Sequence, residues 1–295
     1  MPIEQAVVPF VGCFAAGPEK QDTATLVFAG LPDDSQSSFR RGSAHGPRRI
    51  RSAYDGNCYH ATTEAGVDLT SMVADLGDVP SQNSWNSTAR SYQELAAKLF
   101  RSGKIPFFAG GDHAVTVPVI AALAEIGEPV HIVQIDAHPD LYPEFEGNRD
   151  SHACTITRAL EMRHVASVTQ LGVRTLNAAQ MPQLERYHDR LNIFFARDLL
   201  GELPMLSHIP NGAPVYLTVD LDGFDPAYAP GVSHPVPGGL TPRQVLTFMQ
   251  KAHWKLVGMD AVEVNPDLDV NDQTAILAAR LLHEGMGYAA RQVLL

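Results

Sequence analysis

Residues 132–140 read IVQIDAHPD, an apolar run that ends at a group of metal-binding side chains. The apolar part, residues 132–135, is short and rich in β-branched residues, which predicts a buried strand. Asp136, His138 and Asp140 alternate beyond it, and alternate side chains of an extended segment point the same way. The stretch therefore predicts a strand whose carboxyl end presents two carboxylates and an imidazole on one side.

Two further apolar runs end in the same kind of residue. Residues 105–109 lead through a Gly-Gly pair to His113, and residues 214–219 lead to Asp220 and Asp222. An Asp after a strand is commonly a turn former or a helix cap. Three such clusters in the same context instead favour one shared site, because sites in open parallel sheets form beyond the carboxyl ends of the strands.

The alternation of apolar runs and helical stretches predicts the fold class. Helical periodicity is found at 91–101, 115–125, 153–161, 241–252 and 272–286, and the candidate strands lie near 24–30, 72–76, 105–109, 130–135, 167–173, 192–196, 214–219 and 256–263. Strands that alternate with helices form a parallel sheet covered on both faces. We therefore expect a three-layer α/β/α fold with a central, mainly parallel eight-stranded sheet. No repeat or linker divides it, so residues 1–295 are predicted to form a single domain, with long loops at 81–89 and 141–151.

Composition excludes several classes of protein. Apolar residues make up 45% and charged residues 19% of the 295 residues, and no apolar run approaches the ~20 residues of a membrane span. The net charge of -11 disfavours a nucleic-acid partner and is compatible with a cationic substrate. No basic segment followed by an apolar one is found near the start, which favours a cytoplasmic protein. Cys13, Cys58 and Cys154 are scattered and are predicted to be reduced thiols.

The ligand types indicate the chemistry. Two imidazoles with at least four carboxylates and no thiolate suit Mn²⁺ better than a structural Zn²⁺. Bridging carboxylates would hold two ions ~3.5–4 Å apart, the spacing that ionises a water between them. A hydroxide also needs a charge partner for the substrate and a proton donor for the leaving group. His152, before the helical stretch 153–161, and Glu263, at the end of the last strand, are candidates, although either could be a cap.

The residues also carry a resemblance to a known family. The chain resembles the ureohydrolases, which include arginases and agmatinases, over nearly its whole length, and its pattern is most similar to agmatinases and plant-type arginases. The motifs occur in the family's order: GGDH at 110–113, DAHPD at 136–140, SH at 151–152, DLDGFDP at 220–226, PGGL at 237–240 and EVNP at 263–266.

This resemblance implies two Mn²⁺ ions per subunit that share two bridging carboxylates. One ion would be bound by His113, Asp136, Asp140 and Asp220, and the other by Asp136, His138, Asp220 and Asp222. The resemblance further implies that hydroxide attacks a guanidinium carbon, that Glu263 pairs with the guanidinium, and that His152 passes a proton to the departing amine as urea is released. It also implies a homo-oligomer, either a trimer or a hexamer.

The choice among guanidino substrates depends on the residues around this cluster. Asn177 stands where arginine-specific members have an Asp, and the missing anion favours a substrate without an amino-acid head group. Agmatine, cleaved to putrescine and urea as in polyamine biosynthesis, is therefore the predicted substrate. Asn148, Arg149 and Ser151 could bind a carboxylate, which keeps arginine and guanidino acids such as guanidinobutyrate as alternatives. His234, in the loop between the DLDGFDP and PGGL motifs, is either loop structure or pocket lining and is assigned no role.

Two alternatives come from other classes. A zinc deacetylase of the related fold would need two adjacent histidines, and none of the twelve histidines has a histidine neighbour. A catalytically silent binding protein of the same fold is disfavoured by the intact ligand set together with His152 and Glu263.

Overall fold

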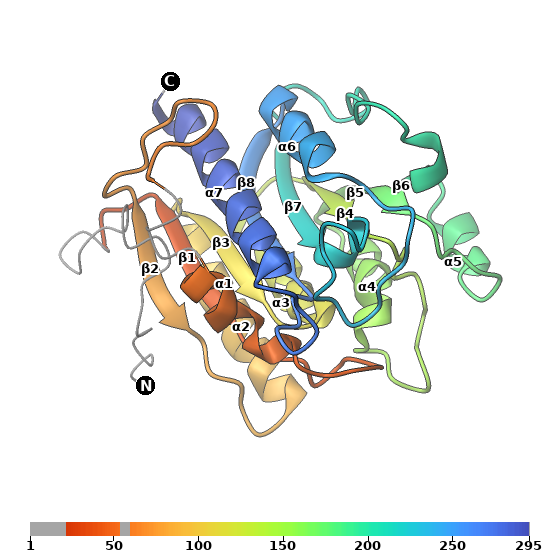
Figure 1. Ribbon diagram of the computed structural model, residues 1–295. Helices are drawn as coiled ribbons and strands as arrows, with labels where there is room; N and C mark the ends of the chain where they lie inside the picture. Colours follow the sequence, from red (N-terminus) through yellow and green to blue (C-terminus); the bar gives the residue numbers. More distant parts are fainter. Residues whose placement is uncertain (1–21, 54–59, 295) are drawn as a thin grey trace.

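The computed structural model describes residues 22–53 and 60–294, and Cys13 and Cys58 lie outside them. The described residues form one eight-stranded sheet in the order β2-β1-β3-β8-β7-β4-β5-β6 (Figure 1). Every neighbouring pair is parallel. The strands are β1 (Leu26–Leu31), β2 (Val73–Asp78), β3 (Ile105–Gly110), β4 (Val130–Ile135), β5 (Val165–Val173), β6 (Leu191–Phe195), β7 (Pro214–Asp220) and β8 (Lys255–Val262). All eight predicted strands are confirmed.

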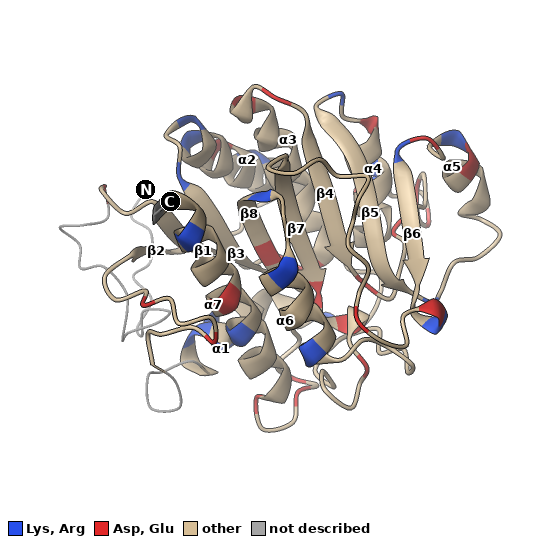
Figure 2. Ribbon diagram, turned by 90° about the horizontal axis from the view of Figure 1, so that it is seen from above, with Lys and Arg blue, Asp and Glu red and all other residues tan. Residues whose placement is uncertain are grey.

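Helices cover both faces of this sheet, as Figure 2 shows from above. They are α1 (Gly46–Ala53), α2 (Trp85–Arg101), α3 (Thr116–Ala122), α4 (Thr155–Glu161), α5 (Met181–Arg186), α6 (Pro242–Lys251) and α7 (Gln273–Leu294). One core cluster joins the sheet to α1, α6 and α7, and a second joins it to α2, α3 and α4. The predicted three-layer α/β/α arrangement is therefore confirmed. In the described part of the chain, no helix is long and apolar enough to cross a membrane.

The loop predicted at 81–89 is wrong in its second half, because α2 begins at Trp85. Ser84 caps this helix, and its Oγ accepts a hydrogen bond from the backbone N–H of Ser87 at 3.3 Å. An N-cap serine satisfies a helix N–H that has no partner within the helix. Asn86 and Ser87, two of the polar residues that indicated a loop, belong instead to the exposed first turn of the helix.

The parallel sheet brings the predicted site residues to one edge. In the register of β4 with β7, Ile135 pairs with Val219, so that Asp136 and Asp220 follow at the same level. β8 lies on the other side of β7, and β3 lies beside β8. The carboxyl ends of four central, adjacent strands therefore supply the residues of the predicted cluster.

Candidate metal centre

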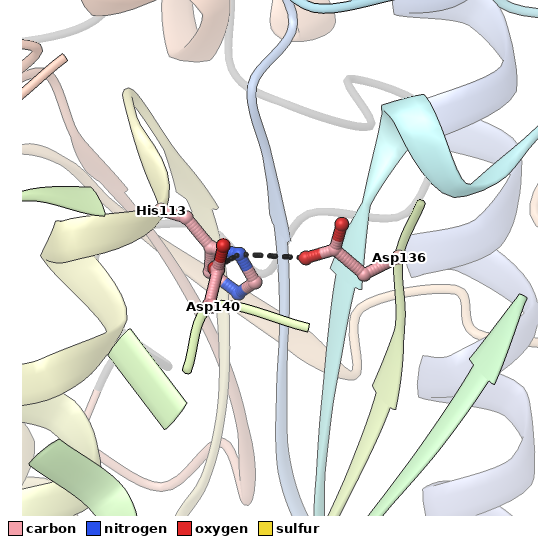
Figure 3. Close-up of side chains that lie close together, drawn as sticks. All are labelled: His113, Asp136 and Asp140. Atoms are coloured by element: carbon pink, nitrogen blue, oxygen red, sulfur yellow. Dashed lines mark ion pairs between the residues drawn. The ribbon is translucent and has the colours of Figure 1, made fainter. Parts of the chain in front are cut away.

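The imidazole of His113 lies among three carboxylates (Figure 3 shows two of them). Its Nδ1 is 3.0 Å from Asp140 Oδ2, 3.1 Å from Asp136 Oδ2 and 3.5 Å from Asp220 Oδ2. The opposite nitrogen, Nε2, lies 2.9 Å from Thr218 Oγ1. Among the described residues, Nδ1 has no hydrogen-bond partner of good geometry. A ring nitrogen that faces three buried carboxylates suits a divalent cation, which imidazole nitrogen and carboxylate oxygens can bind together.

A second histidine extends the cluster. His138 Nδ1 lies 2.9 Å from Asp222 Oδ2 and 3.6 Å from Asp136 Oδ1. Within residues 22–53 and 60–294, two groups of side chains could each hold a metal ion, namely His113 with Asp136 and Asp140, and Asp136 with His138 and Asp222. Asp136 is common to both groups. Asp220 belongs to neither group but approaches His113, so the structure brings together all six predicted ligands.

The electrostatics of the cluster also fit cations. Burial, together with the neighbouring carboxylates of Asp222 and Asp136, raises the pKa of Asp220. Burial and the charge of Asp136 raise the pKa of Asp140 to about 6. Burial lowers the pKa of His138, but the carboxylates of Asp222 and Asp136 outweigh it and raise that pKa to about 12. Buried carboxylates that repel one another are costly unless cations neutralise them.

The local backbone differs from the extended segment that the period of two predicted. β4 ends at Ile135, and the backbone N–H of His138 donates to Asp136 Oδ1 at 2.6 Å. Asp140 has a positive φ of 48°. After β7 the chain likewise forms a short 3₁₀ helix, Leu221–Gly223, in which the Asp222 N–H donates to Asp220 Oδ1 at 2.8 Å. Asp136 and Asp220 thus each accept a hydrogen bond from the backbone N–H two residues later and close a turn. These turns bring the ligand side chains together.

The second turn is fixed by close packing. A Cβ at Gly223 would lie 2.8 Å from the backbone nitrogen of Asp136, so only glycine lets the two ligand segments approach this closely. The guanidinium of Arg174 donates to the carbonyls of Asp222 at 2.7 Å and of Phe224 at 3.1 Å. The turn that carries Asp222 is thereby held against the end of β4.

His152 and Glu263 form a pair beside the cluster. His152 Nδ1 lies 2.8 Å from Glu263 Oε1, which also accepts from the backbone N–H of His113 at 3.0 Å. Glu263 follows β8 with a positive φ of 65°, and its Oε2 is buried without a hydrogen-bond partner among the described residues. Burial lowers the pKa of His152, but the Glu263 carboxylate outweighs it and raises that pKa to about 9.

A cavity of about 190 Å³ opens onto these side chains. Its lining includes five of the six predicted ligands, all but Asp136, together with His152 and Glu263. The other lining residues are Ser38, Tyr142, Phe145, Ala153, Thr175, Asn177, Gln180 and His234. Among the described residues that line the cavity there is no Lys or Arg. The cavity lining is therefore rich in carboxylates and imidazoles, and among the described residues it offers no guanidinium or ammonium group to a ligand.

The residues predicted to contact the substrate are separated by the structure. Asn177 lines the cavity, and its Nδ2 donates to Tyr142 Oη at 2.6 Å. Asn148 and Ser151 are not among the lining residues. Asn148 Nδ2 donates to Gln36 Oε1 at 2.9 Å, and Ser151 caps the turn that carries His152.

Two further residues are Arg149, which was predicted with Asn148 and Ser151 to be able to bind a carboxylate, and His234. Arg149 is also absent from the lining, and it pairs with Glu161 at 3.3 Å instead. His234 lies inside the cavity, where its ring centroid is 5.2 Å from that of His152. Of the two interpretations that the sequence left open for His234, loop structure or pocket lining, the structure places it in the lining.

Comparison with known proteins adds to this geometry. Residues 24–287 match the model of the Arginase family. The chain is 36% identical over 283 residues to arginase 1, mitochondrial, of Arabidopsis thaliana, covering 91% of this chain and 81% of that one. It is 35% identical over 279 residues to guanidino acid hydrolase, mitochondrial, of Homo sapiens, covering 90% and 78%. The names of these relatives specify mitochondria, so the cytoplasmic location stays a prediction.

Solved structures agree in fold over almost the whole chain. The agmatine ureohydrolase of Thermoplasma volcanium superposes with a TM-score of 0.84 at 30% identity, covering 99% of this chain and 97% of that one. The arginase from Medicago truncatula gives 0.79 at 33% identity, covering 90% and 87%.

Proposed function

Because the chain belongs to the arginase family, whose members hydrolyse guanidino compounds, we propose that its substrate is agmatine, cleaved to putrescine and urea. The observation that carries the proposal is the charge of the cavity lining. Among the described residues, Glu263 is the one lining carboxylate outside the proposed metal ligands and can pair with the guanidinium, whereas a substrate carboxylate would meet no Lys or Arg there. Arginine is the second candidate, because the relatives include plant arginases.

We propose that two Mn²⁺ ions bind the cluster. Oxygen and imidazole donors without thiolate suit this ion, and the lone pair of His113 Nδ1 faces three carboxylates. The residues that would hold the ions are His113, Asp136, His138, Asp140, Asp220 and Asp222, with Asp136 and Asp220 shared. When bound, such a pair supplies an ionised water as the nucleophile.

Two side chains outside the metal cluster, Glu263 and His152, then act on the substrate. Glu263 Oε2 is buried and has no hydrogen-bond partner among the described residues, so it is free to accept from the guanidinium. His152 is protonated near neutral pH because Glu263 raises its pKa to about 9. It can therefore give a proton to the departing amine, a step typically worth ~10²- to 10⁴-fold in rate.

We also propose a homo-oligomer, a trimer or hexamer. Two large apolar side chains on the segment between β6 and β7 support a contact with another subunit, since Leu200 is 91% and Met205 is 63% exposed. Sedimentation of the purified full-length protein tests this, and a monomer would contradict it.

The decisive experiment measures urea release by the Mn²⁺-loaded protein. Agmatine, arginine, 4-guanidinobutyrate and 3-guanidinopropionate are compared by kcat/KM, and the bound metal is counted by mass spectrometry. Preference for agmatine with two metals per subunit supports the proposal. Preference for arginine or a guanidino acid would reject agmatine as the substrate, and no urea from any compound would reject the activity itself.

A further inference from the structure

Ser38, on the segment between β1 and α1, contacts His152 twice. Its Oγ lies 2.9 Å from His152 Nε2, and its backbone N–H donates to the same nitrogen at 3.2 Å. On the other side of the ring, Nδ1 lies 2.8 Å from Glu263 Oε1. The imidazole is thus held between a serine and a carboxylate, although Ser38 is 114 residues away in sequence.

The segment that carries Ser38 is itself held in place. The backbone N–H of Gln36 donates to Asp112 Oδ2 at 2.9 Å, and its carbonyl accepts from the backbone N–H of His152 at 3.3 Å. Gly111 packs directly against this segment, since a Cβ at Gly111 would overlap the carbonyl oxygen of Asp33. Ser38 is therefore presented to His152 by contacts that also involve the end of β3.

The two contacts from Ser38 differ in the protonation state of the ring that they suit. A backbone N–H only donates, so it requires an unprotonated Nε2, and the proton of neutral His152 then sits on Nδ1 and faces Glu263. In the charged ring Nε2 carries a proton, which the Ser38 hydroxyl can accept and the Ser38 N–H cannot. The hydroxyl alone is able to change roles when His152 gains or loses a proton.

The burial of the three groups gives the direction of proton exchange. Glu263 is 3% and His152 is 8% exposed, whereas Ser38 is exposed and lines the same cavity. We propose that Ser38 positions the His152 ring and relays protons between its Nε2 and water at the cavity mouth, an inference that rests on the proposed function. Ser38 is a positioning residue in this scheme, and His152 contacts the substrate.

The relay is balanced in protons and bonds. After His152 has given its Nε2 proton to the departing amine, the Ser38 Oγ–H bond breaks as its proton moves to Nε2. A new Oγ–H bond forms with a proton taken from water or a buffer acid at the mouth. Ser38 is unchanged at the end, and His152 is again charged against Glu263.

The neighbouring Ser37 offers a matched control. Its hydroxyl donates to the carbonyl of Phe39 at 3.0 Å, and it is not among the residues that line the cavity. Ser37→Ala therefore removes an equivalent hydroxyl from the same segment without touching His152. Ser38→Thr keeps a hydroxyl at the proposed position.

The first test compares kcat and KM of these variants as Mn²⁺-loaded full-length proteins, with the best substrate of the urea assay. For Ser38→Ala we expect kcat to fall by about tenfold or more, KM and metal content to hold, and added imidazole buffer to restore part of the rate. Ser38→Thr and Ser37→Ala should stay near wild type. A kcat for Ser38→Ala within about twofold of wild type, or a loss that imidazole does not restore, would overturn the relay.

A second test needs no turnover. The rate at which diethyl pyrocarbonate modifies His152, followed by peptide mass spectrometry across pH, reports the pKa of the ring. Loss of the hydroxyl that accepts the Nε2 proton destabilises the charged ring, so the half-point for Ser38→Ala should move to lower pH than for wild type and Ser37→Ala. An unmoved half-point would overturn the inference even if the wild type released no urea, a result that by itself rejects only the proposed function.

Discussion

His113 Nε2 lies 2.9 Å from Thr218 Oγ1, and this contact leaves Nδ1 facing the carboxylates. For Nδ1 to bind a metal it must be unprotonated, so the proton sits on Nε2 and is donated to Thr218. Thr218→Val keeps the shape and removes the acceptor. We expect metal affinity to fall by roughly 10- to 100-fold, measured by titration with Mn²⁺. Thr169→Val, which removes a buried hydroxyl that contacts His208 at 2.7 Å, should bind metal as wild type does, and an unchanged affinity in Thr218→Val would contradict the orienting role.

Asp136 is the carboxylate common to both groups of ligands. Asp136→Asn preserves volume but removes a charge from both, so we expect loss of bound metal and of nearly all urea release. The matched control is Asp198→Asn, at an exposed acid that lies 3.7 Å from Arg197. Mass spectrometry of the intact protein and the urea assay check the outcome. If Asp136→Asn kept both metal ions and full activity, Asp136 would not be a ligand of either ion.

The strands were predictable from sequence, whereas the turns that shape the site were not. β4 and β7 have almost every residue buried, so their apolar runs stand out without knowledge of their neighbours. The positive φ of Asp140 and the turn closed by Asp136 depend on side-chain hydrogen bonds that no periodicity reveals. The ligands were still identifiable because a parallel sheet fixes where each strand ends.

The positions of α1 and Ser38 depend on tertiary contacts for the same reason. In α1 the buried residue Arg51 pairs with Asp75 at 3.0 Å and with Asp78. Because a charged residue takes a buried position, the sequence of α1 shows no continuous apolar stripe. Ser38 stands in a serine-rich run without a motif, and its contact with His152 exists only once β1 and β3 are paired. Both depend on partners far away in the chain.

The cavity lining predicts a switch in substrate preference. Asn177→Lys places a cation at a lining position where the wild type offers none. We expect kcat/KM to fall for agmatine and to rise for 4-guanidinobutyrate, with their ratio changing by about tenfold or more, which corresponds to about 1.4 kcal/mol. Ala179→Lys adds the same charge at an exposed neighbour outside the lining, and it should change the ratio far less. Equal ratios in both variants would show that the position is not a head-group contact.

Histidine burial in α7 predicts how stability depends on pH. His283 is buried, and burial lowers its pKa to about 4 from an ordinary 6.5. His283 binds a proton more tightly in the unfolded chain than in the folded one. Its contribution to the unfolding free energy is therefore complete above pH ~6.5 and is lost as pH falls towards ~4. For chelator-treated protein between about pH 7.5 and pH 5, wild type should lose about 2 kcal/mol more unfolding free energy than His283→Gln. Denaturant unfolding measures this, with exposed His188→Gln expected to follow wild type, and parallel losses in wild type and His283→Gln would refute it.

Glu263 gives the sharpest separation of substrate binding from metal binding. Its Oε2 has no hydrogen-bond partner among the described residues, and its Oε1 contacts His152 rather than a predicted metal ligand side chain. Glu263→Gln keeps the shape and removes the charge, so the guanidinium loses a charge-assisted hydrogen bond worth roughly 1.5–3 kcal/mol. We therefore expect KM to rise by about tenfold or more, kcat to fall because His152 loses its anionic partner, and metal content to stay the same.

A ligand that cannot turn over isolates the binding contribution of Glu263. The inhibition constant of free guanidinium should rise in Glu263→Gln by a factor similar to that of KM, because both report the same contact. Glu146→Gln, at an exposed acid on the loop beside the cavity, should leave both constants unchanged. If Glu263→Gln bound guanidinium normally and lost only kcat, Glu263 would act through His152 alone, and its pairing with the guanidinium would be rejected.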